Sequence, residues 1–321
     1  MKRRTLLLSA PALLAFGAVH AQPDYPNRPI KIMVTVAPGA AGDTMARRIG
    51  EPLGKLLGQP VVVENRPGAQ GAIASRAAAK APADGYTFLL AGNSSHAANV
   101  HMMKEPGYDP IKDFTPITQL TLNPLLLVVN ADLPVKNLQE FLKYAREKSG
   151  KLNYGIGNSG SLVAAQLLKA QGGFDAVGVN YAGTAQATTD LLAGRVDFVM
   201  NDPVVAGPHI QSGKLRALGI TSRQRLATLP DVAPLAESGL PGYDYASWIA
   251  VYGPAGLPRE ITQRVHQGLL KVMADPEMTK YLGSAGMIPT TSPSPERLQA
   301  FNQEQIRLWG RWVKDAGIKP E

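Results

Sequence analysis

The 321-residue sequence contains no cysteine. A chain without cysteine has no disulfide framework and no cysteine to carry a lipid anchor, so we expect a free protein rather than one tethered to a membrane. Common signatures of catalysis are absent as well: the sequence contains neither a G-x-S-x-G nucleophile elbow nor an H-E-x-x-H zinc pattern. The sequence therefore predicts no catalytic residues, no bound metal and no cofactor.

Histidine is scarce, with five residues in the whole chain. His20 lies in the N-terminal segment, and the others are His96, His101, His209 and His266. None of them has a partner at a catalytic or metal-binding spacing. We interpret each of the four as a surface or helix-capping residue.

Acidic residues are outnumbered, since 33 Lys and Arg face 25 Asp and Glu and the net charge is +8. Lys2, Arg3 and Arg4 account for three of these charges, which leaves +5 for the rest of the chain. This balance suits anionic small solutes and is equally typical of ordinary exported proteins. The basic residues are scattered and not interleaved with aromatic ones, so we expect no nucleic-acid partner.

The N-terminal segment MKRRTLLLSAPALLAFGAVHA has the features of a secretory signal peptide, residues 1–21, with cleavage after Ala21. Its apolar run is broken by Pro11 and Gly17 and is shorter than the roughly 20 apolar residues that span a bilayer. We therefore expect export to the periplasm. The pair Arg3–Arg4 leaves the general and the twin-arginine export routes both open.

Strand-length apolar runs alternate with amphipathic stretches along the mature chain, which predicts an α/β protein with mostly parallel, buried strands. Two extended segments, residues 114–130 and 243–258, are suited to carry the chain between two lobes. We expect residues 25–124 and 247–321 to form one lobe and residues 125–246 the other. Two connecting segments make a hinge, and a hinge places a cleft between the lobes.

Residues 155–160, GIGNSG, match the G-x-G-x-x-G fingerprint of dinucleotide-binding folds. That fingerprint normally lies in the first βαβ unit and is followed, about 20 residues on, by a strand that ends in an acidic residue. Here the motif lies deep in the chain, and Asp175 precedes the next strand instead of ending it. We therefore interpret GIGNSG as a turn of small residues before a helix, where unpaired backbone N–H groups attract an anion.

The same device of strand, small-residue turn and helix recurs. It follows Val36 at PGAAG, with the helix starting at Asp43 or Thr44; it follows Leu90 at AGNSS; and it follows Tyr181 at AGT. Such turns are also ordinary helix caps. Several of them at the carboxyl ends of strands predict a ligand site, because ligands of open α/β sheets bind there.

Six ordered motifs resemble those of one family. APGAAGDTMARR resembles the first-helix motif P-G-G-x-x-D-x-x-A-R of the substrate-binding receptors of tripartite tricarboxylate transporters, also called Bug-type receptors. VVVENRPGAQGAIA and PADGYTFLL resemble their V-x-N-R-P-G-A-G-G loop and P-D-G-Y-T strand. The remaining three are YDPIKDFTPI, TDLLAGRVDFVM and LPDVAPLAESGLPGYDYASWIAVYGPAGLP, and together the six cover essentially the whole mature chain.

The resemblance implies a type II periplasmic binding protein fold, with two lobes, a two-segment hinge and a ligand cleft between them. Such a receptor captures a small carboxylate and delivers it to the membrane subunits of a tripartite tricarboxylate-type transporter. We expect a monomer. The first-helix motif also points to Pro38, Gly39 and Asp43 beside the cleft. The predicted ligand-binding residues are Ala40, Ala41, Gly42, Gly68, Ala69, Gln70, Asn93, Ser94, Ser95, Asn158, Ser159, Gly160, Ser161, Gly183, Thr184, Ala185, Gln186 and Asp202.

The chain departs from the family pattern at four places. One is Gln70, which replaces a Gly and is suited to project an amide into the cleft. Ala40 replaces a Gly and adds a Cβ, and Ala182 replaces a Lys, which removes a positive charge. No His follows Ser161, where the family commonly has S-x-x-H-L. Asp202 falls where the family often has an Asp that faces the cleft, and is suited to receive a ligand amino or hydroxyl group.

Other assignments remain open at this point. An exported enzyme that acts on a small organic acid or ester in the same cleft is the alternative function, and the effector lobe of a regulator is a third. The ligand is open among di- and tricarboxylates, amino acids and aromatic acids. Trp248 is suited either to core packing or to ligand contact, whereas Trp309 and Trp312 indicate packing along one helix face.

Overall fold

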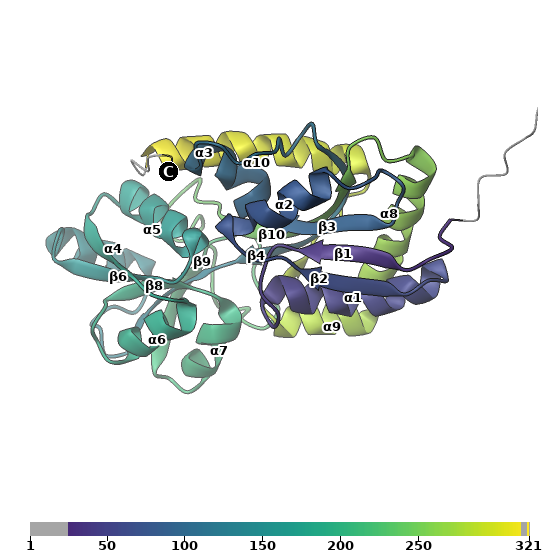
Figure 1. Ribbon diagram of the computed structural model, residues 1–321. Helices are drawn as coiled ribbons and strands as arrows, with labels where there is room; N and C mark the ends of the chain where they lie inside the picture. The colour runs from purple at the N-terminus through teal and green to yellow at the C-terminus, as the bar shows by residue number, and fades with distance from the viewer. Residues whose placement is uncertain (1–24, 316–319, 321) are drawn as a thin grey trace, which may run out of the picture.

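The computed structural model describes residues 25–315 and residue 320. These residues form two parts, each built on its own β-sheet, which lie side by side in Figure 1. We call the part with the six-stranded sheet the first lobe and the part with the five-stranded sheet the second lobe. The predicted signal peptide, residues 1–21, lies outside the described residues. Within residues 25–315, no helix combines the length and the apolar character needed to cross a membrane.

The first lobe's sheet has the strand order β11-β4-β10-β3-β1-β2. Its strands are β1 (Ile30–Val34), β2 (Val61–Asn65), β3 (Thr87–Gly92), β4 (Phe114–Pro124), β10 (Ala246–Pro254) and β11 (Ile288–Pro289). Along β1, Ile30 and Ile32 pack into one hydrophobic cluster, while Met33 packs into another. Successive side chains of a strand point to opposite faces, so this sheet is covered on both sides.

Two groups of helices supply the cover (Figure 1). On one face lie α1 (Ala41–Leu57), α8 (Arg259–Met273) and α9 (Pro276–Ser284), and on the other lie η1 (Ala69–Gly71), α2 (Ala72–Ala79), η2 (Ser94–Ala98), α3 (Asn99–Met102) and α10 (Pro295–Asp315). Helix α1 buries Met45, Ile49 and Leu53, the four-residue spacing that places side chains on one helical face. Its position follows from that apolar stripe.

The second lobe's sheet has the order β7-β6-β8-β5-β9. Its elements are β5 (Leu126–Asn130), α4 (Leu138–Glu147), β6 (Leu152–Ile156), α5 (Ser159–Gly172), β7 (Ala176–Asn180), α6 (Thr184–Leu192), β8 (Phe198–Asn201), α7 (Pro203–Gln211) and β9 (Leu215–Ile220). Strands β7, β6 and β8 are parallel, with α5 and α6 as their crossover connections. Helices α5 and α6 therefore begin at the carboxyl edge of this sheet.

The expectation that the strands are mostly parallel is wrong, whereas most of them are buried as expected. Of the nine strand pairings between described residues, four are parallel and five are antiparallel. The antiparallel ones involve β4, β5, β9, β10 and β11, where the chain passes between the lobes or returns from the second one. The edge strands β2 and β7 are only partly buried. Strand direction in these places follows from the path of the chain between two sheets.

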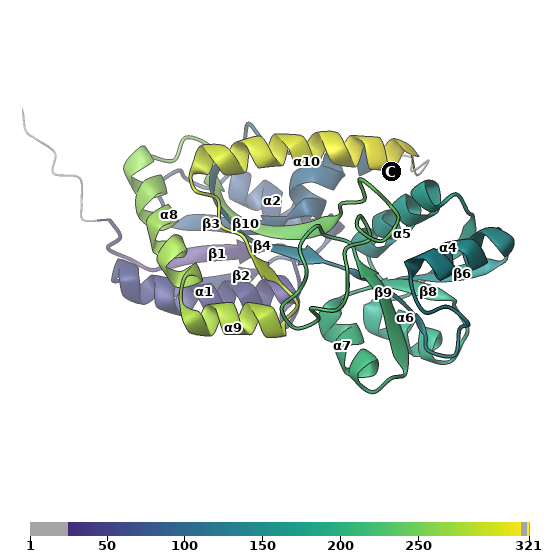
Figure 2. The same ribbon diagram turned by 180° about the vertical axis from the view of Figure 1, so that it is seen from behind.

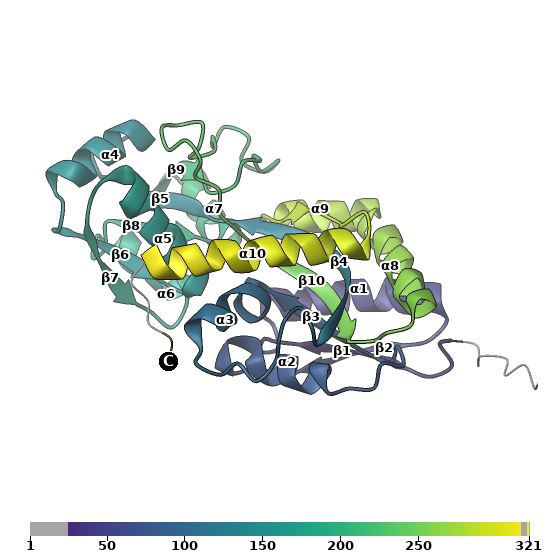
Figure 3. The same ribbon diagram turned by 90° about the horizontal axis from the view of Figure 1, so that it is seen from above.

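The chain crosses between the lobes twice. It leaves β4 at Pro124 and enters β5 at Leu126, and it returns from β9 through a long connection to β10 (Figure 2). Thr221 joins the two crossings: its hydroxyl accepts a hydrogen bond from the Leu125 N–H at 2.8 Å, and its carbonyl accepts one from the Tyr245 N–H at 2.9 Å. Helix α10 lies across both lobes and reaches α5 (Figure 3).

Candidate functional site

A cavity of about 750 Å³ lies between the two sheets and is lined by both lobes. Two other hollows of similar size, about 770 and 840 Å³, are lined by the first lobe alone. The interlobe cavity is the candidate site because the ends of strands and the first turns of helices converge on it. Pockets at such positions in α/β folds are where ligands bind.

Twelve of the predicted residues line this cavity, and six do not. The lining set is Ala40, Ala41, Gly42, Gly68, Gln70, Asn93, Ser94, Ser95, Asn158, Ser159, Gly160 and Asp202. The six outside it are Ala69, Ser161, Gly183, Thr184, Ala185 and Gln186. Their roles toward a ligand stay predictions. The structure explains what three of these six do, because Ser161, Thr184 and Gln186 each bond to a cavity-lining residue or its neighbour.

Helix α1 opens onto the cavity with its first turn uncapped. It begins at Ala41, two or three residues earlier than expected, and Ala40 provides no side-chain cap. The first intrahelical bond runs from Thr44 N–H to the Ala40 carbonyl at 2.9 Å, so the N–H groups of Ala41 and Gly42 have no intrahelical partner. These two donors, together with the positive end of the helix dipole, favour an anion.

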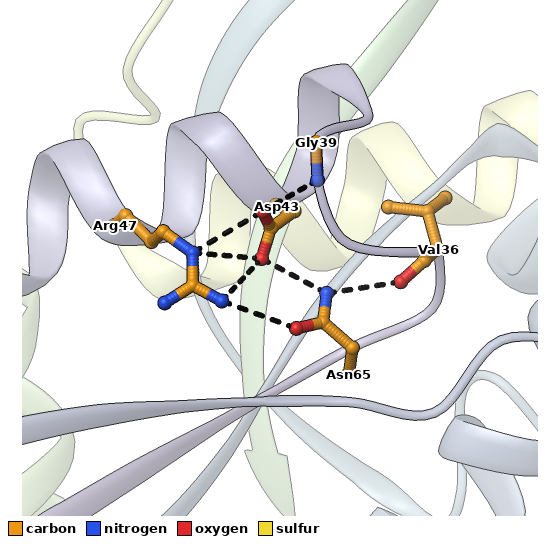
Figure 4. Close-up of polar contacts among 5 residues, drawn as sticks. All are labelled: Val36, Gly39, Asp43, Arg47 and Asn65. Atoms are coloured by element: carbon orange, nitrogen blue, oxygen red, sulfur yellow. Dashed lines mark hydrogen bonds and ion pairs between the residues drawn. The ribbon is translucent and has the colours of Figure 1, made fainter.

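Asp43, expected beside the cleft, instead holds the turn before α1 from behind (Figure 4). Its carboxylate accepts hydrogen bonds from the Gly39 N–H at 2.8 Å, from the Asn65 amide at 2.9 Å and from the Arg47 guanidinium at 3.1 Å. The hydrogen bond from Arg47, followed by those from Gly39 and Asn65, lowers the pKa of Asp43 to about 2. Asp43 therefore shapes the loop and is not one of the residues that line the cavity.

The loop from Gly68 to Gly71 approaches the cavity in a strained conformation. Ala69 and Gln70 have φ of 45° and 50°, the left-handed region that residues with a Cβ rarely adopt. The side chain of Asn99 steadies the loop by donating to the Gln70 carbonyl at 3.3 Å. Strained backbone of this kind clusters at functional sites.

The third first-lobe contribution is η2, a π-helical turn that follows Asn93. Ser95 lies within 3.2 Å of Nδ1 of His96 and lines the cavity. His96 is fully buried and stacks on Tyr252 with 4.0 Å between ring centroids. Its burial lowers its pKa to about 3. The expectation of surface or capping histidines is therefore wrong for His96, and for His266, which is buried with Nδ1 at 2.9 Å from the Ile117 carbonyl.

The GIGNSG segment supplies the second-lobe counterpart, α5. Asn158 and Ser161 form a reciprocal capping box, in which the Ser161 N–H donates to Oδ1 of Asn158 at 2.8 Å and the Ser161 hydroxyl accepts from the Asn158 N–H at 3.1 Å. The N–H and the hydroxyl of Ser161 are therefore both engaged in this cap. The N–H groups of Ser159 and Gly160 have no intrahelical partner, and both residues line the cavity. GIGNSG is thus an anion-facing helix start in geometry.

Asp202 is the only charged side chain among the described residues that line the cavity. It stands at the N-cap position of α7 but makes no cap bond there, and its carboxylate accepts a hydrogen bond from the Thr184 hydroxyl at 2.8 Å. Burial raises the pKa of Asp202, and the Thr184 hydroxyl opposes part of that rise. The site therefore combines backbone donors and neutral polar side chains with a single charged acceptor, Asp202.

The sequence interpretation missed the residues of the two crossings. Asn123, Tyr245 and Ser247 line the cavity beside Trp248. Trp248 is buried, packs against Phe301 with 5.4 Å between ring centroids and also lines the cavity, so both of its proposed roles apply to its position. A signal was available, because these residues lie in the two extended segments that were assigned to the hinge.

Comparison with known proteins places the chain in a family. Residues 45–318 match the family described as "Tripartite tricarboxylate transporter family receptor". The protein BugT of Bordetella pertussis is 32% identical over 298 residues, which cover 92% of this chain and 91% of BugT.

Solved structures agree with that match. An R. palustris protein solved with adipate superposes with a TM-score of 0.81 at 34% identity, covering 93% of this chain and 100% of that one. MatC from Rhodopseudomonas palustris, with bound malate, superposes with a TM-score of 0.75 at 32% identity, covering 90% of this chain and 100% of MatC.

Trp309 and Trp312 lie as the sequence predicts, with 5.6 Å between their ring centroids on one side of α10.

Proposed function

The chain belongs to the tripartite tricarboxylate transporter receptor family, and from that premise we propose that it captures a small carboxylate in the cavity between its lobes. This is a family of solute-binding receptors rather than enzymes, which decides against the alternative of an exported enzyme. One observation carries the proposal: the uncapped first turn of α1 and the free N–H groups at the start of α5 open into one cavity from opposite lobes.

The electrostatics of the cavity support a carboxylate. No Lys or Arg is among the described lining residues, so a bound anion depends on backbone N–H groups and on the helix dipoles of α1 and α5. Each dipole places about half a positive charge at the helix N-terminus. Hydrogen bonds to a carboxylate are roughly twice as strong as neutral ones, particularly where water is excluded.

The remaining parts of the proposal concern the setting in which the receptor works. Family members are periplasmic binding proteins, and we propose that residues 1–21 direct this chain to the periplasm and are removed. We propose residues 25–124 and 247–321 as one rigid lobe and residues 125–246 as the other. Closure of the two around the solute then presents a monomeric receptor to the membrane subunits of a tripartite tricarboxylate-type transporter.

Native mass spectrometry of the purified protein, followed by a thermal-shift screen of carboxylates, tests the function. A solute at 100 times its Kd stabilises the folded state by about 2.7 kcal/mol, which raises the melting temperature measurably. Solution scattering should show compaction with the same solute. If no carboxylate raises the melting temperature or compacts the protein, the proposed function is wrong.

Proline substitutions test the backbone donors directly. Ala41 and Ser159 are the first helical residues of α1 and α5, a position where proline removes an N–H without breaking the helix. The preceding residues Ala40 and Asn158 are extended, with ψ of 163° and 174°, as proline requires. We expect Ala41→Pro and Ser159→Pro each to weaken carboxylate binding by about tenfold or more.

A matched control places the same change away from the cavity. Arg259 is the first residue of α8, follows Pro258 with ψ of 139°, and lines a different hollow. Arg259→Pro should leave the Kd for the carboxylate unchanged. Equal weakening in all three variants would contradict a role for the N–H groups of α1 and α5.

A further inference from the structure

Tyr245 lies where the cavity, the returning crossing and α10 meet. Its N–H donates to the Thr221 carbonyl, as described above, and its side chain is 1% exposed. The ring packs against both Trp309 and Trp312 of α10, with centroid distances of 6.5 and 5.5 Å. These contacts hold the ring in one orientation, so the hydroxyl has a defined direction.

The Tyr245 hydroxyl points at the first turn of α5. A Cβ at Gly160 would lie 2.8 Å from that oxygen, so the hydroxyl reaches this turn only because residue 160 has no side chain. Among the described residues, the hydroxyl has no hydrogen-bond partner although it is buried. A buried hydroxyl without a partner costs free energy that a new partner recovers.

The neighbourhood of the hydroxyl limits the chemistry of that partner. Burial, and then the charge of Asp202, raises the pKa of Tyr245, so it stays protonated and lies close enough to Asp202 to sense its charge. An ionised carboxylate such as Asp202 only accepts hydrogen bonds, whereas a tyrosine hydroxyl both donates and accepts. A second carboxylate of a solute placed here would face Asp202, the only charged side chain in the described lining.

A hydroxyl or an ammonium group satisfies both residues. Either group donates to Asp202 and still pairs with the Tyr245 hydroxyl, and either avoids like-charge repulsion. We propose that Tyr245 is a specificity-determining residue, which together with Asp202 selects carboxylates that carry a hydroxyl or ammonium substituent. The inference rests on the proposed function, since it names the class of solute for the same cavity.

Three probes of one carbon skeleton test the inference: succinate without a substituent, L-malate with a hydroxyl and L-aspartate with an ammonium group. Isothermal titration calorimetry gives a Kd for each with the full mature chain. We expect the wild-type protein to bind L-malate or L-aspartate at least about tenfold more tightly than succinate, and the preferred one identifies the substituent. Tyr245→Phe, which removes only the hydroxyl, should bring the preferred solute to within about twofold of succinate.

Tyr243 provides the matched control. It is buried two residues away, and its hydroxyl donates to the Ala164 carbonyl at 2.6 Å instead of lining the cavity. Tyr243→Phe should lower the melting temperature and keep the wild-type ratio of Kd values. An unchanged ratio in Tyr245→Phe, the same loss in Tyr243→Phe, or equal wild-type affinity for all three probes overturns the inference and leaves the proposed function intact. If the wild-type protein binds none of the three and no other carboxylate, the proposed function fails with it.

Discussion

Thr221 and Leu125 hold each other by two hydrogen bonds across the start of the second lobe. The Thr221 N–H donates to the Leu125 carbonyl at 2.9 Å, and the Leu125 N–H donates to the Thr221 hydroxyl at 2.8 Å. Leu125 lies in the first crossing between the lobes, and the Thr221 carbonyl also accepts from Tyr245 in the second. Thr221 thus links the two crossings at the edge of the cavity, through its hydroxyl and N–H to Leu125 and through its carbonyl to Tyr245.

Replacing the Thr221 side chain tests the hydrogen bond between its hydroxyl and the Leu125 N–H. Thr221→Val has almost the same shape but leaves the buried Leu125 N–H without a partner, which should cost about 1–3 kcal/mol of the free energy of unfolding. Thr221→Ser keeps the hydroxyl and should cost clearly less. Urea denaturation of the three proteins gives these values, and equal losses for Val and Ser would mean that the hydrogen bond is not the main contribution of this side chain.

Asp202 should also affect the free energy of unfolding, measured in the absence of solute. Because burial raises its pKa, the folded state binds the proton more tightly than the unfolded state, and stability falls as the pH rises through the folded pKa. Asp202→Asn keeps an acceptor for Thr184 and removes the charge. The variant should be more stable than the wild type at neutral pH, and the difference should vanish below pH 3.8, the ordinary pKa of an aspartate. A wild-type protein that is the more stable one at neutral pH would contradict this expectation.

Asp43 should give the opposite dependence of the free energy of unfolding on pH. Its pKa is lowered from 3.8 to about 2, first by Arg47 and then by Gly39 and Asn65. The stability from its ionised form is complete above pH 3.8 and is lost as the pH falls toward about 2. Asp43→Asn should therefore lower the free energy of unfolding by about 2 kcal/mol at neutral pH, with a gap that closes in acid.

Glu51 is the control for Asp43. It lies on the same helix, is exposed and pairs only with Lys55 four residues on. Glu51→Gln should unfold like the wild type at neutral pH, because exposed ion pairs contribute little. If both variants lose the same stability, the network around Asp43 has no special role.

Local pattern predicted much of this architecture. The strand-length apolar runs and the small-residue turns placed β1, β3 and β6, and they located the starts of α5 and α6 to within about two residues, because these features depend on neighbours in the chain. The family resemblance, carried by six ordered motifs, is confirmed over residues 45–318. Sequence reasoning therefore worked best where periodicity and turn chemistry act within a few residues.

Interpretation of the sequence failed for residues whose contact partners lie far along the chain. The family motif placed Asp43 beside the cleft, and its bond to Asn65, 22 residues on, has no local signature that would have revealed its part in shaping the loop. His96 was assigned to the surface because its stacking partner, Tyr252, lies on a strand that follows the whole second lobe. The antiparallel strands and the lining position of Tyr245 were missed for the same reason, since both depend on how the chain returns from the second lobe.

His96 should make the folded state sensitive to acid. Its pKa falls from 6.5 to about 3 because burial disfavours the charged ring, so the unfolded state takes up a proton at a higher pH than the folded one. The stability linked to neutral His96 is complete above pH 6.5 and is lost progressively toward about pH 3. Wild-type protein should lose about 2 kcal/mol between pH 6.5 and about pH 5. His96→Phe keeps an aromatic ring against Tyr252 and should flatten the plot of the free energy of unfolding against pH in this range. The control His209→Gln, on the partly exposed helix α7, should keep the wild-type slope. A slope in His96→Phe as steep as that of the wild type would assign the acid sensitivity to other groups.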